Sequence, residues 1–281
     1  MRYLGNKTKL LSWIKECIFE TLDSNINTTN KFYDLFSGTG SVSEYFKNDF
    51  NIVANDLLLS SYTITKAKLL KEKPENIPEI LQELNTKEEE GFILEKYSEG
   101  NRLYFSKKNG RKIDGILQHI IKLKNEAKIN EETYIYLLYC VLLGINKISN
   151  ITGVYGAFLK KLSPNATKDL EIKEIDIIES DKIHEVFNID CIDLLDNINE
   201  NDIVYIDPPY NARQYGTNYH LLDTIVKYDN PDIKIIRNQE SVSGLRNNIE
   251  KYKWCVKREV KNEFEKILNC KAKFIFMSYN N

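Results

Sequence analysis

Residues 202–210 read Asp-Ile-Val-Tyr-Ile-Asp-Pro-Pro-Tyr. The apolar, largely β-branched run at 203–206 predicts a buried strand. Proline has no N–H for the ladder of a central strand, so this strand is expected to end at Asp207. The acid then lies at the carboxyl end of a strand, where open α/β sheets bind their ligands. An acceptor, a stiff loop and an aromatic ring together suit a planar base that carries an amino group.

The composition of the 281-residue chain fits one catalytic domain with an insertion, because 42% of its residues are hydrophobic. The net charge is −2, so any nucleic-acid surface must be local. The 5 cysteines and 3 histidines are scattered, which predicts no metal site and no disulfide framework and fits a reducing cytosol. No apolar stretch is long enough to span a bilayer, and we expect a cytoplasmic protein without a membrane partner.

The first seventy residues predict a β-α-β unit with parallel strands. A helix is expected at 10–22, where apolar residues recur at helical spacing. Strands are expected at 31–36 and 51–56, with a helix from Ser41 between them.

The centre of the chain reads as helical and polar, with its strongest amphipathic helix at 131–145. Strand patterns return at 186–190, 203–207 and 272–277. The sheet is therefore expected to be interrupted by an inserted, mainly helical domain. The expected boundaries are 1–66 for the first catalytic part, 67–178 for the insertion and 179–281 for the second catalytic part.

A glycine-containing turn follows the first strand, at Asp34-Leu35-Phe36-Ser37-Gly38-Thr39-Gly40. Glycines after a strand allow a tight turn and a close approach of the backbone to a ligand. The third glycine of a dinucleotide fingerprint is absent here, which disfavours a nicotinamide or flavin site. A plain β-α turn is the alternative.

Two more segments suggest a nucleoside-shaped site. Asp56 ends the second strand, where an acid accepts hydrogen bonds from ribose hydroxyls; alternatively it caps the next helix. Tyr3 and Lys7 flank a glycine turn near the N-terminus, and a lysine there suits a cofactor carboxylate. An exposed N-terminal arm is the alternative for that segment.

Taken in order, these motifs resemble those of the Dam-like adenine-N6 DNA methyltransferases, the D12 class of the alpha group. The resemblance covers essentially the whole chain, with the insertion less constrained, and is carried by residues 2–7, 34–40, 55–56 and 207–210. It implies an α/β, Rossmann-like sheet that binds S-adenosylmethionine, with an inserted helical target-recognition domain.

The resemblance also implies which residues contact the cofactor. Lys7 is expected near the methionine carboxylate, Asp56 at the ribose, and the segment after the third strand near the adenine ring. The full expected set is Tyr3, Lys7, Asp34, Phe36, Ser37, Gly38, Gly40, Asp56, Asp190, Cys191 and Asp207.

The catalytic set implied by the resemblance is Asp207, Pro208, Pro209 and Tyr210. Asp207 and the Pro208 carbonyl are expected to accept hydrogen bonds from N6 of the target adenine, which directs the nitrogen lone pair at the methyl carbon. Tyr210 is expected to stack on the base, which must be flipped out of the duplex to be reached.

Two predicted loops, at residues 146–161 and 211–220, combine basic, amide and aromatic side chains, which suit DNA phosphates and base edges. Ordinary surface loops are the alternative for both. The expected DNA-binding residues are Lys147, Tyr155, Lys160, Lys161, Asn211, Arg213, Gln214, Tyr215, Asn218 and Tyr219.

The last predicted strand lies at 272–277, whereas members of the resembled family continue with two further strands. We therefore expect C-terminal strands to be missing. The explanations considered are a truncated chain, a second polypeptide that completes the sheet, and a symmetry mate that covers its edge.

The sequence thus predicts a site-specific methyltransferase that modifies adenine N6 in double-stranded DNA, with a cognate restriction endonuclease as its functional partner. Two alternatives stay open. One is cytosine-N4 methylation, although aspartate rather than serine before Pro-Pro favours adenine. The other is a non-catalytic DNA-binding subunit of a split methyltransferase.

Overall fold

The computed structural model describes residues 4–209 and 212–279, apart from the side chains of residues 24, 26 and 27. The chain divides into two compact units. We call the first the sheet unit; it comprises Tyr3–Glu72, Ile177–Tyr215 and Glu250–Asn281. The second is the helical unit, which contains Lys73–Asp176 and Gly216–Ile249.

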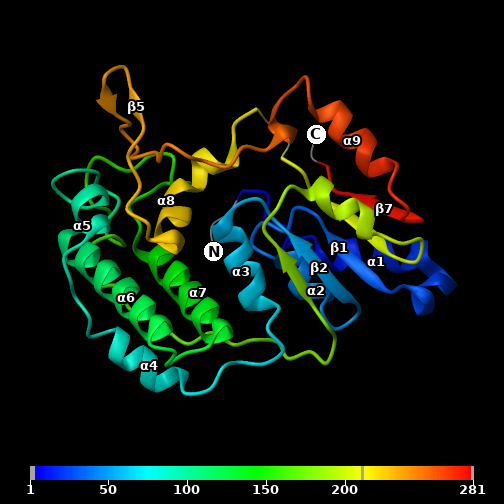
Figure 1. The fold of residues 1–281 in the computed structure, drawn as a ribbon, viewed down its shortest axis with the longest axis horizontal. Helices are drawn as coiled ribbons and strands as arrows, with labels where there is room; N and C mark the ends of the chain where they lie inside the picture. Colours follow the sequence, from blue (N-terminus) through cyan, green and yellow to red (C-terminus); the bar gives the residue numbers. More distant parts are fainter. Residues whose placement is uncertain (1–3, 210–211, 280–281) are drawn as a thin grey trace. The chain divides into compact units, whose positions relative to one another are not determined.

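The sheet unit is built on five parallel strands in the order β3-β2-β1-β4-β7 (Figure 1). Their bounds are Lys31–Asp34 for β1, Asn51–Asn55 for β2, Glu185–Phe187 for β3, Ile203–Ile206 for β4 and Phe274–Met277 for β7. The predicted Rossmann-like α/β sheet is confirmed, with strands one to two residues shorter than predicted.

One face of the sheet packs against α1 (Leu11–Leu22) and α2 (Ser41–Phe46). Phe32 is level with Ile52 and Ile203 in the parallel register, so these three side chains share that face. The Phe32 ring stacks on Phe46 with centroids 5.0 Å apart. Burial of this aromatic and aliphatic layer is the main stabilising contribution that the sequence pattern predicts.

The remaining short elements of the sheet unit flank the strand ends. They are η1 (Asp23–Thr28), α3 (Leu59–Lys68), η2 (Cys191–Asn197), η3 (Lys253–Cys255) and α9 (Val260–Leu268). The Tyr33 hydroxyl, on the opposite face of β1 from Phe32, donates to the Asn197 carbonyl at 3.0 Å. This hydrogen bond ties η2 to the sheet.

A buried lysine joins two distant segments of the sheet unit. The ammonium of Lys47 donates to the carbonyl oxygens of Lys68 and Leu70 at 2.9 and 3.0 Å, and to that of Ile178. Burial lowers the pKa of Lys47. The lysine thus fixes the chain where it leaves for the helical unit and where it returns.

The helical unit confirms the predicted, mainly helical insertion. Its helices are α4 (Ile77–Leu84), α5 (Phe92–Tyr97), α6 (Lys107–Asn125) and α7 (Glu131–Ile148), and α8 (Tyr215–Lys227) belongs to it from Gly216 onward. The side chains of Ser106 and Asn130 cap α6 and α7 by accepting a backbone N–H three residues later. Helix α7 contains the whole segment predicted at 131–145.

The helical unit begins at Lys73 and its first long segment ends at Asp176, whereas the predicted insertion spans 67–178; the largest difference concerns a third segment. Residues 216–249 group with the helical unit, although they follow the Asp-Pro-Pro segment in sequence. The reason is burial: the ring of His220 lies at 3.1 Å from the Tyr155 carbonyl through Nε2, and the Tyr97 hydroxyl donates to the Gly244 carbonyl at 2.6 Å. These contacts hold both α8 and the following loop inside the helical core.

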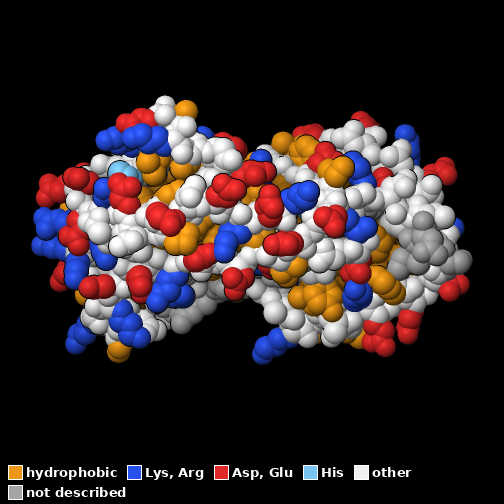
Figure 2. All heavy atoms as spheres, turned by 90° about the horizontal axis from the view of Figure 1, so that it is seen from below, with side chains coloured by type: hydrophobic (Ala, Val, Ile, Leu, Met, Phe, Trp, Pro, Cys, Tyr) orange, Lys and Arg blue, Asp and Glu red, His pale blue; other side chains and the backbone are white. Residues whose placement is uncertain are grey.

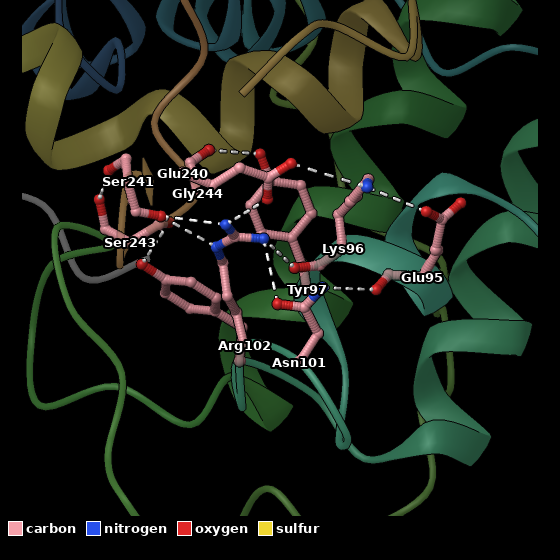
Figure 3. A network of polar contacts seen from close by, with 10 residues as sticks. Glu95, Lys96, Tyr97, Asn101, Arg102, Glu240, Ser241, Ser243 and Gly244 are labelled. Atoms are coloured by element: carbon pink, nitrogen blue, oxygen red, sulfur yellow. Dashed lines mark hydrogen bonds and ion pairs between the residues drawn. The ribbon is translucent and has the colours of Figure 1, made fainter. Parts of the chain in front are cut away.

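A short hairpin in this segment joins β5 (Ile235–Ile236) to β6 (Gln239–Glu240), and its turn residues both have positive φ. Arg102 anchors its base by donating to Glu240 at 2.8 Å and to the Ser241 carbonyl at 3.0 Å (Figure 3). The hairpin itself is exposed.

Acidic and basic side chains are intermixed on the face drawn in Figure 2, as the small net charge predicts. Across the described part of the chain, every helix is too short or too polar to cross a bilayer.

Candidate functional site

Three aspartates meet at one edge of the sheet because they end or follow adjacent parallel strands. Asp34 is the last residue of β1, and Asp56 and Asp207 directly follow β2 and β4. All three line one pocket in the sheet unit. The other lining residues are Leu4, Gly5, Asn6, Lys7, Phe36, Ser37, Gly38, Thr39, Ser41, Val42, Tyr205, Pro209, Tyr215 and Tyr252.

The glycine turn forms one wall of this pocket. Gly38 and Gly40 have φ of 53° and 67°, the left-handed region that glycine tolerates best. A Cβ on Gly40 would lie 2.7 Å from the hydroxyl oxygen and 3.0 Å from Cα of Thr65. Glycine at position 40 therefore serves both the turn and the close packing of α3 behind it.

Asp56 is nearly fully buried, and its carboxylate is oriented by three donors. Oδ2 accepts from the Gly38 N–H at 2.9 Å, and Oδ1 accepts from the Leu58 N–H at 2.9 Å. The Tyr252 hydroxyl donates to Oδ1 at 2.6 Å. The Leu58 contact is a local turn that precedes α3, whose N-cap residue is Leu58 and which has no side-chain cap, so Asp56 does not cap this helix.

Asp207 forms an ion pair with Lys7, with 2.9 Å between Nζ and Oδ2. Both side chains are largely buried, at 15% and 10% exposure. Burial raises the pKa of Asp207 to about 6, and the hydrogen bond and charge of Lys7 act in the opposite direction. Oδ1 of Asp207 is buried, and no described residue donates to it.

The structure thus places Lys7 against the predicted catalytic acid. An ammonium has three donors, so the pairing with Asp207 leaves Lys7 able to donate to a cofactor carboxylate as well.

Asp34 lines the same pocket and is almost completely buried. The Ser43 hydroxyl donates to its Oδ2 at 2.6 Å. Burial raises the pKa of Asp34 to about 7; the Ser43 hydrogen bond opposes this shift, and the charges of Asp207 and Asp56 add to it. The edge of the sheet therefore concentrates negative potential, which favours a ligand with a positive charge.

Asp190 and Cys191 lie in an adjoining pocket that shares Phe36 and Tyr252 with the first. Asp190 caps η2 by accepting the Ile192 N–H, and it pairs with Lys253 at 2.7 Å. Burial raises the pKa of the Cys191 thiol, so this cysteine is a packing residue at neutral pH.

Some of the predicted DNA-binding residues are accessible and others are not. Lys147, Lys160, Lys161 and Arg213 are exposed, whereas Gln214 and Tyr215 are partly buried. Gln214 uses its amide on the backbone of Tyr252, donating at 3.0 Å and accepting at 2.8 Å.

Three predicted DNA contacts need correction. Tyr155, Asn218 and Tyr219 are buried in the helical unit, so their side chains do not face a DNA surface. The Tyr155 N–H donates to the Asn218 carbonyl at 2.8 Å, which packs this loop against α8. Asn218 and Tyr219, predicted to lie in a loop, are instead on the buried side of α8.

The predictions for Tyr3, Tyr210 and Asn211 lie outside the described residues. Among the residues that are described, no group of three His, Cys, Asp or Glu side chains could hold a metal ion.

Sequence reasoning missed Tyr252, which lines both pockets, and Trp254, which lines the adjoining one. The Trp254 and Phe36 rings meet edge to face at 5.1 Å. The only signal in the sequence is a pair of aromatic residues among lysines at 251–254, which has no characteristic spacing.

Comparison with known proteins agrees with this geometry. The profile of the family described as D12 class N6 adenine-specific DNA methyltransferase matches residues 3–277. The type II methyltransferase M.NlaIII of Neisseria lactamica is 38% identical over 297 residues, which cover 100% of this chain and 84% of that protein. The type II methyltransferase M.CviAII of Paramecium bursaria Chlorella virus 1 is 36% identical over 285 residues, 99% of this chain and 82% of that protein.

The type II methyltransferase M.FokI of Planomicrobium okeanokoites is 38% identical over 299 residues, 100% of this chain. This chain spans only 44% of the length of M.FokI. The match to the family profile and the two nearly full-length relatives lead to one conclusion: the chain belongs to the D12 class of N6 adenine-specific DNA methyltransferases.

Proposed function

We propose that this protein transfers a methyl group from S-adenosylmethionine to N6 of a flipped-out adenine in double-stranded DNA. The observation that carries the proposal is the position of Asp207, a largely buried acid with a buried Oδ1, in the pocket that the glycine turn and Asp56 also line.

The pocket fits the proposed cofactor in charge and shape. When bound, S-adenosylmethionine supplies a methyl group on a positively charged sulfur, and the nearby acids Asp34, Asp56 and Asp207 favour such a charge. Gly38 lines the pocket, and Gly40 keeps the glycine turn close against α3. The pocket residues that would hold the cofactor are Lys7, Phe36, Ser37, Gly38 and Asp56, with Asp190 and Cys191 in the adjoining pocket.

Asp207 would act on the amino group of the base. An aromatic amine is a poor nucleophile because its lone pair is delocalised into the ring. Asp207 and the Pro208 carbonyl would accept hydrogen bonds from its two N–H groups, which turns the lone pair out of the ring plane. One of these protons must leave after methylation, and the Asp207 carboxylate would receive it.

DNA contact is assigned to the exposed basic residues rather than to the whole predicted set. Lys147, Lys160, Lys161 and Arg213 are exposed and can neutralise phosphates. We further propose that the enzyme is the modification component of a restriction-modification system in the cytoplasm, with a cognate endonuclease as its partner. The names of the relatives, type II methyltransferases, support this context.

The test uses unmethylated duplex DNA and S-adenosylmethionine labelled in its methyl group. The wild-type protein should transfer label to DNA, and nucleoside analysis should identify N6-methyladenine. Asp207→Ala should reduce the transfer by at least about a thousandfold, because it removes an acceptor for the reacting amino group.

Asp196→Ala, which changes an exposed aspartate of η2, serves as the matched control and should leave the rate unchanged. The proposal fails if the wild type transfers no methyl group, if the product is N4-methylcytosine, or if Asp207→Ala retains full activity.

A further inference from the structure

Residues 251–255 cross the edge of the sheet at which the candidate site lies. We call this segment the strap. It follows Ile249, the last residue of the helical unit's second segment, and it belongs to the sheet unit. Its residues contact the loops after β1, β2, β3 and β4. Because the strap contacts all four loops, it is a candidate for organising the site.

Tyr252 provides the central contact of the strap. Its hydroxyl donates to Oδ1 of Asp56 at 2.6 Å, and its side chain is 5% exposed. The residue lines both the main pocket and the adjoining one. A short hydrogen bond from a buried phenol to a carboxylate restricts the rotation of that carboxylate.

The residues beside Tyr252 contact the neighbouring loops. The Lys253 ammonium pairs with Asp190 at 2.7 Å, after β3. The Trp254 ring packs edge to face on Phe36, after β1, and Trp254 is 6% exposed. The three loop residues that the strap contacts here, Asp56, Asp190 and Phe36, all belong to the predicted cofactor set.

The backbone of the strap is itself fixed by the loop after β4. Gln214 forms two hydrogen bonds with the backbone of Tyr252, and the Cys255 thiol lies 3.7 Å from the Arg213 carbonyl. The two hydrogen bonds with the Gln214 amide fix the backbone of Tyr252, and this places the Tyr252 hydroxyl within hydrogen-bonding distance of Asp56.

We propose that Tyr252 is a positioning residue of the cofactor site, which holds the Asp56 carboxylate in the orientation that binds the ribose of S-adenosylmethionine. The inference rests on the proposed function, because it takes Asp56 as the ribose ligand. Tyr252 acts through Asp56 and does not take part in methyl transfer. Its contribution is therefore to cofactor affinity and not to the chemical step.

Titration calorimetry of the full chain with S-adenosylmethionine, without DNA, tests this directly. Tyr252→Phe keeps the ring and removes only the hydroxyl. It should weaken cofactor binding by roughly fivefold, the loss expected for one net hydrogen bond. In methylation assays the KM for the cofactor should rise by a similar factor while kcat stays within about twofold.

Two further variants separate positioning from general structure. Tyr33→Phe removes a hydroxyl that bonds the Asn197 carbonyl in the same unit but does not line the pocket. It should leave cofactor affinity unchanged. In an Asp56→Asn background, Tyr252→Phe should have little additional effect, because the residue through which it acts has already lost its charge.

The outcomes distinguish the two proposals. If the wild type does not bind S-adenosylmethionine, both the proposed function and this assignment are overturned. If the wild type binds and Tyr252→Phe binds equally well, only the assignment to Tyr252 is overturned. The assignment is also overturned if Tyr252→Phe weakens cofactor binding equally in the wild-type and Asp56→Asn backgrounds, since the effect then does not pass through Asp56. It is likewise overturned if Tyr33→Phe weakens cofactor binding as much as Tyr252→Phe does. Thermal unfolding of each variant confirms that the folded protein is being titrated.

Discussion

The ion pair between Lys7 and Asp207 determines the charge of the proposed catalytic acid. Burial alone favours the protonated carboxyl, which accepts hydrogen bonds less well, and the pKa of Asp207 is raised to about 6 even beside the lysine. Lys7 opposes this shift at 2.9 Å. At neutral pH the pair therefore keeps Asp207 in the ionised form that two-acceptor activation of an amino group requires.

Removal of the lysine charge should therefore change the pH dependence of methylation. In Lys7→Met the influence that lowers the pKa of Asp207 is lost, so this pKa rises further. Because the active form is the carboxylate, activity falls as pH decreases through that pKa. The acid limb of the single-turnover rate should move to higher pH by roughly one unit. Rates measured from about pH 5 to about pH 9 at saturating cofactor give the comparison.

Lys9→Met is the matched control, because Lys9 is an exposed lysine two residues along the same segment. Its acid limb should coincide with that of the wild type. An unchanged acid limb in Lys7→Met would show that the ion pair does not set the ionisation of Asp207.

At the scale of elements, the glycine turn between β1 and α2 depends on Gly40. Alanine at this position meets two penalties: a positive φ of 67° and a Cβ that lies 2.7 Å from Thr65 Oγ1 and 3.0 Å from Thr65 Cα. The backbone strain alone costs about 1 kcal/mol, and displacement of α3 adds to it. We expect Gly40→Ala to lower the free energy of unfolding by about 3 kcal/mol, as measured by urea denaturation.

Gly100→Ala isolates the backbone contribution. Gly100 has a φ of 104°, but the nearest atom to its added Cβ is 3.8 Å away. Gly100→Ala should lower the free energy of unfolding by about 1 kcal/mol, which is the cost of the backbone strain alone. Equal losses in both variants would mean that the contact with Thr65 relaxes without cost.

The elements that are predicted best from sequence are those whose burial follows from the hydrophobic pattern of a single short segment. The runs at 203–206 and 52–54 are apolar on both faces, so the predicted strands and the acids at their ends are where the structure places them. The apolar run of α7, which is buried without a break from Ile135 to Leu142, is similarly local. These patterns need no information about distant residues.

The wrong predictions concern residues whose surroundings come from elsewhere in the chain. Asn218 and Tyr219 are polar or aromatic in a segment without strong hydrophobic patterning, yet α8 is buried by the Tyr155 loop and by Tyr97. Tyr252 was missed for the same reason: its partner Asp56 is 196 positions away. Contacts between residues so far apart in the chain cannot be predicted from the local sequence.

At the scale of the whole molecule, the chain passes between the two units several times, and two of these passages are fixed by Lys47. The lysine bonds carbonyls at positions 68 and 70, just before the passage at Glu72, and at position 178, just after the return at Ile177. The Ser180 hydroxyl adds a hydrogen bond to the Lys47 carbonyl at 2.9 Å. The side chain thus closes the large loop formed by the inserted residues at its base.

Lys47→Met should loosen the base of this loop. Methionine has a similar length, but it leaves three backbone carbonyl oxygens without their hydrogen-bond donor. We expect the free energy of unfolding to fall by about 3 kcal/mol, since each unsatisfied buried acceptor is costly and loss of the buried charge offsets only part of that cost. Trypsin should cleave faster at the exposed Lys71 and Lys73. Lys15→Met, which removes a half-exposed ion pair with Asp49, should change stability by no more than about 0.5 kcal/mol. If Lys47→Met is as stable and as resistant to trypsin as Lys15→Met, the two passages are held by the rest of the sheet unit and not by this lysine.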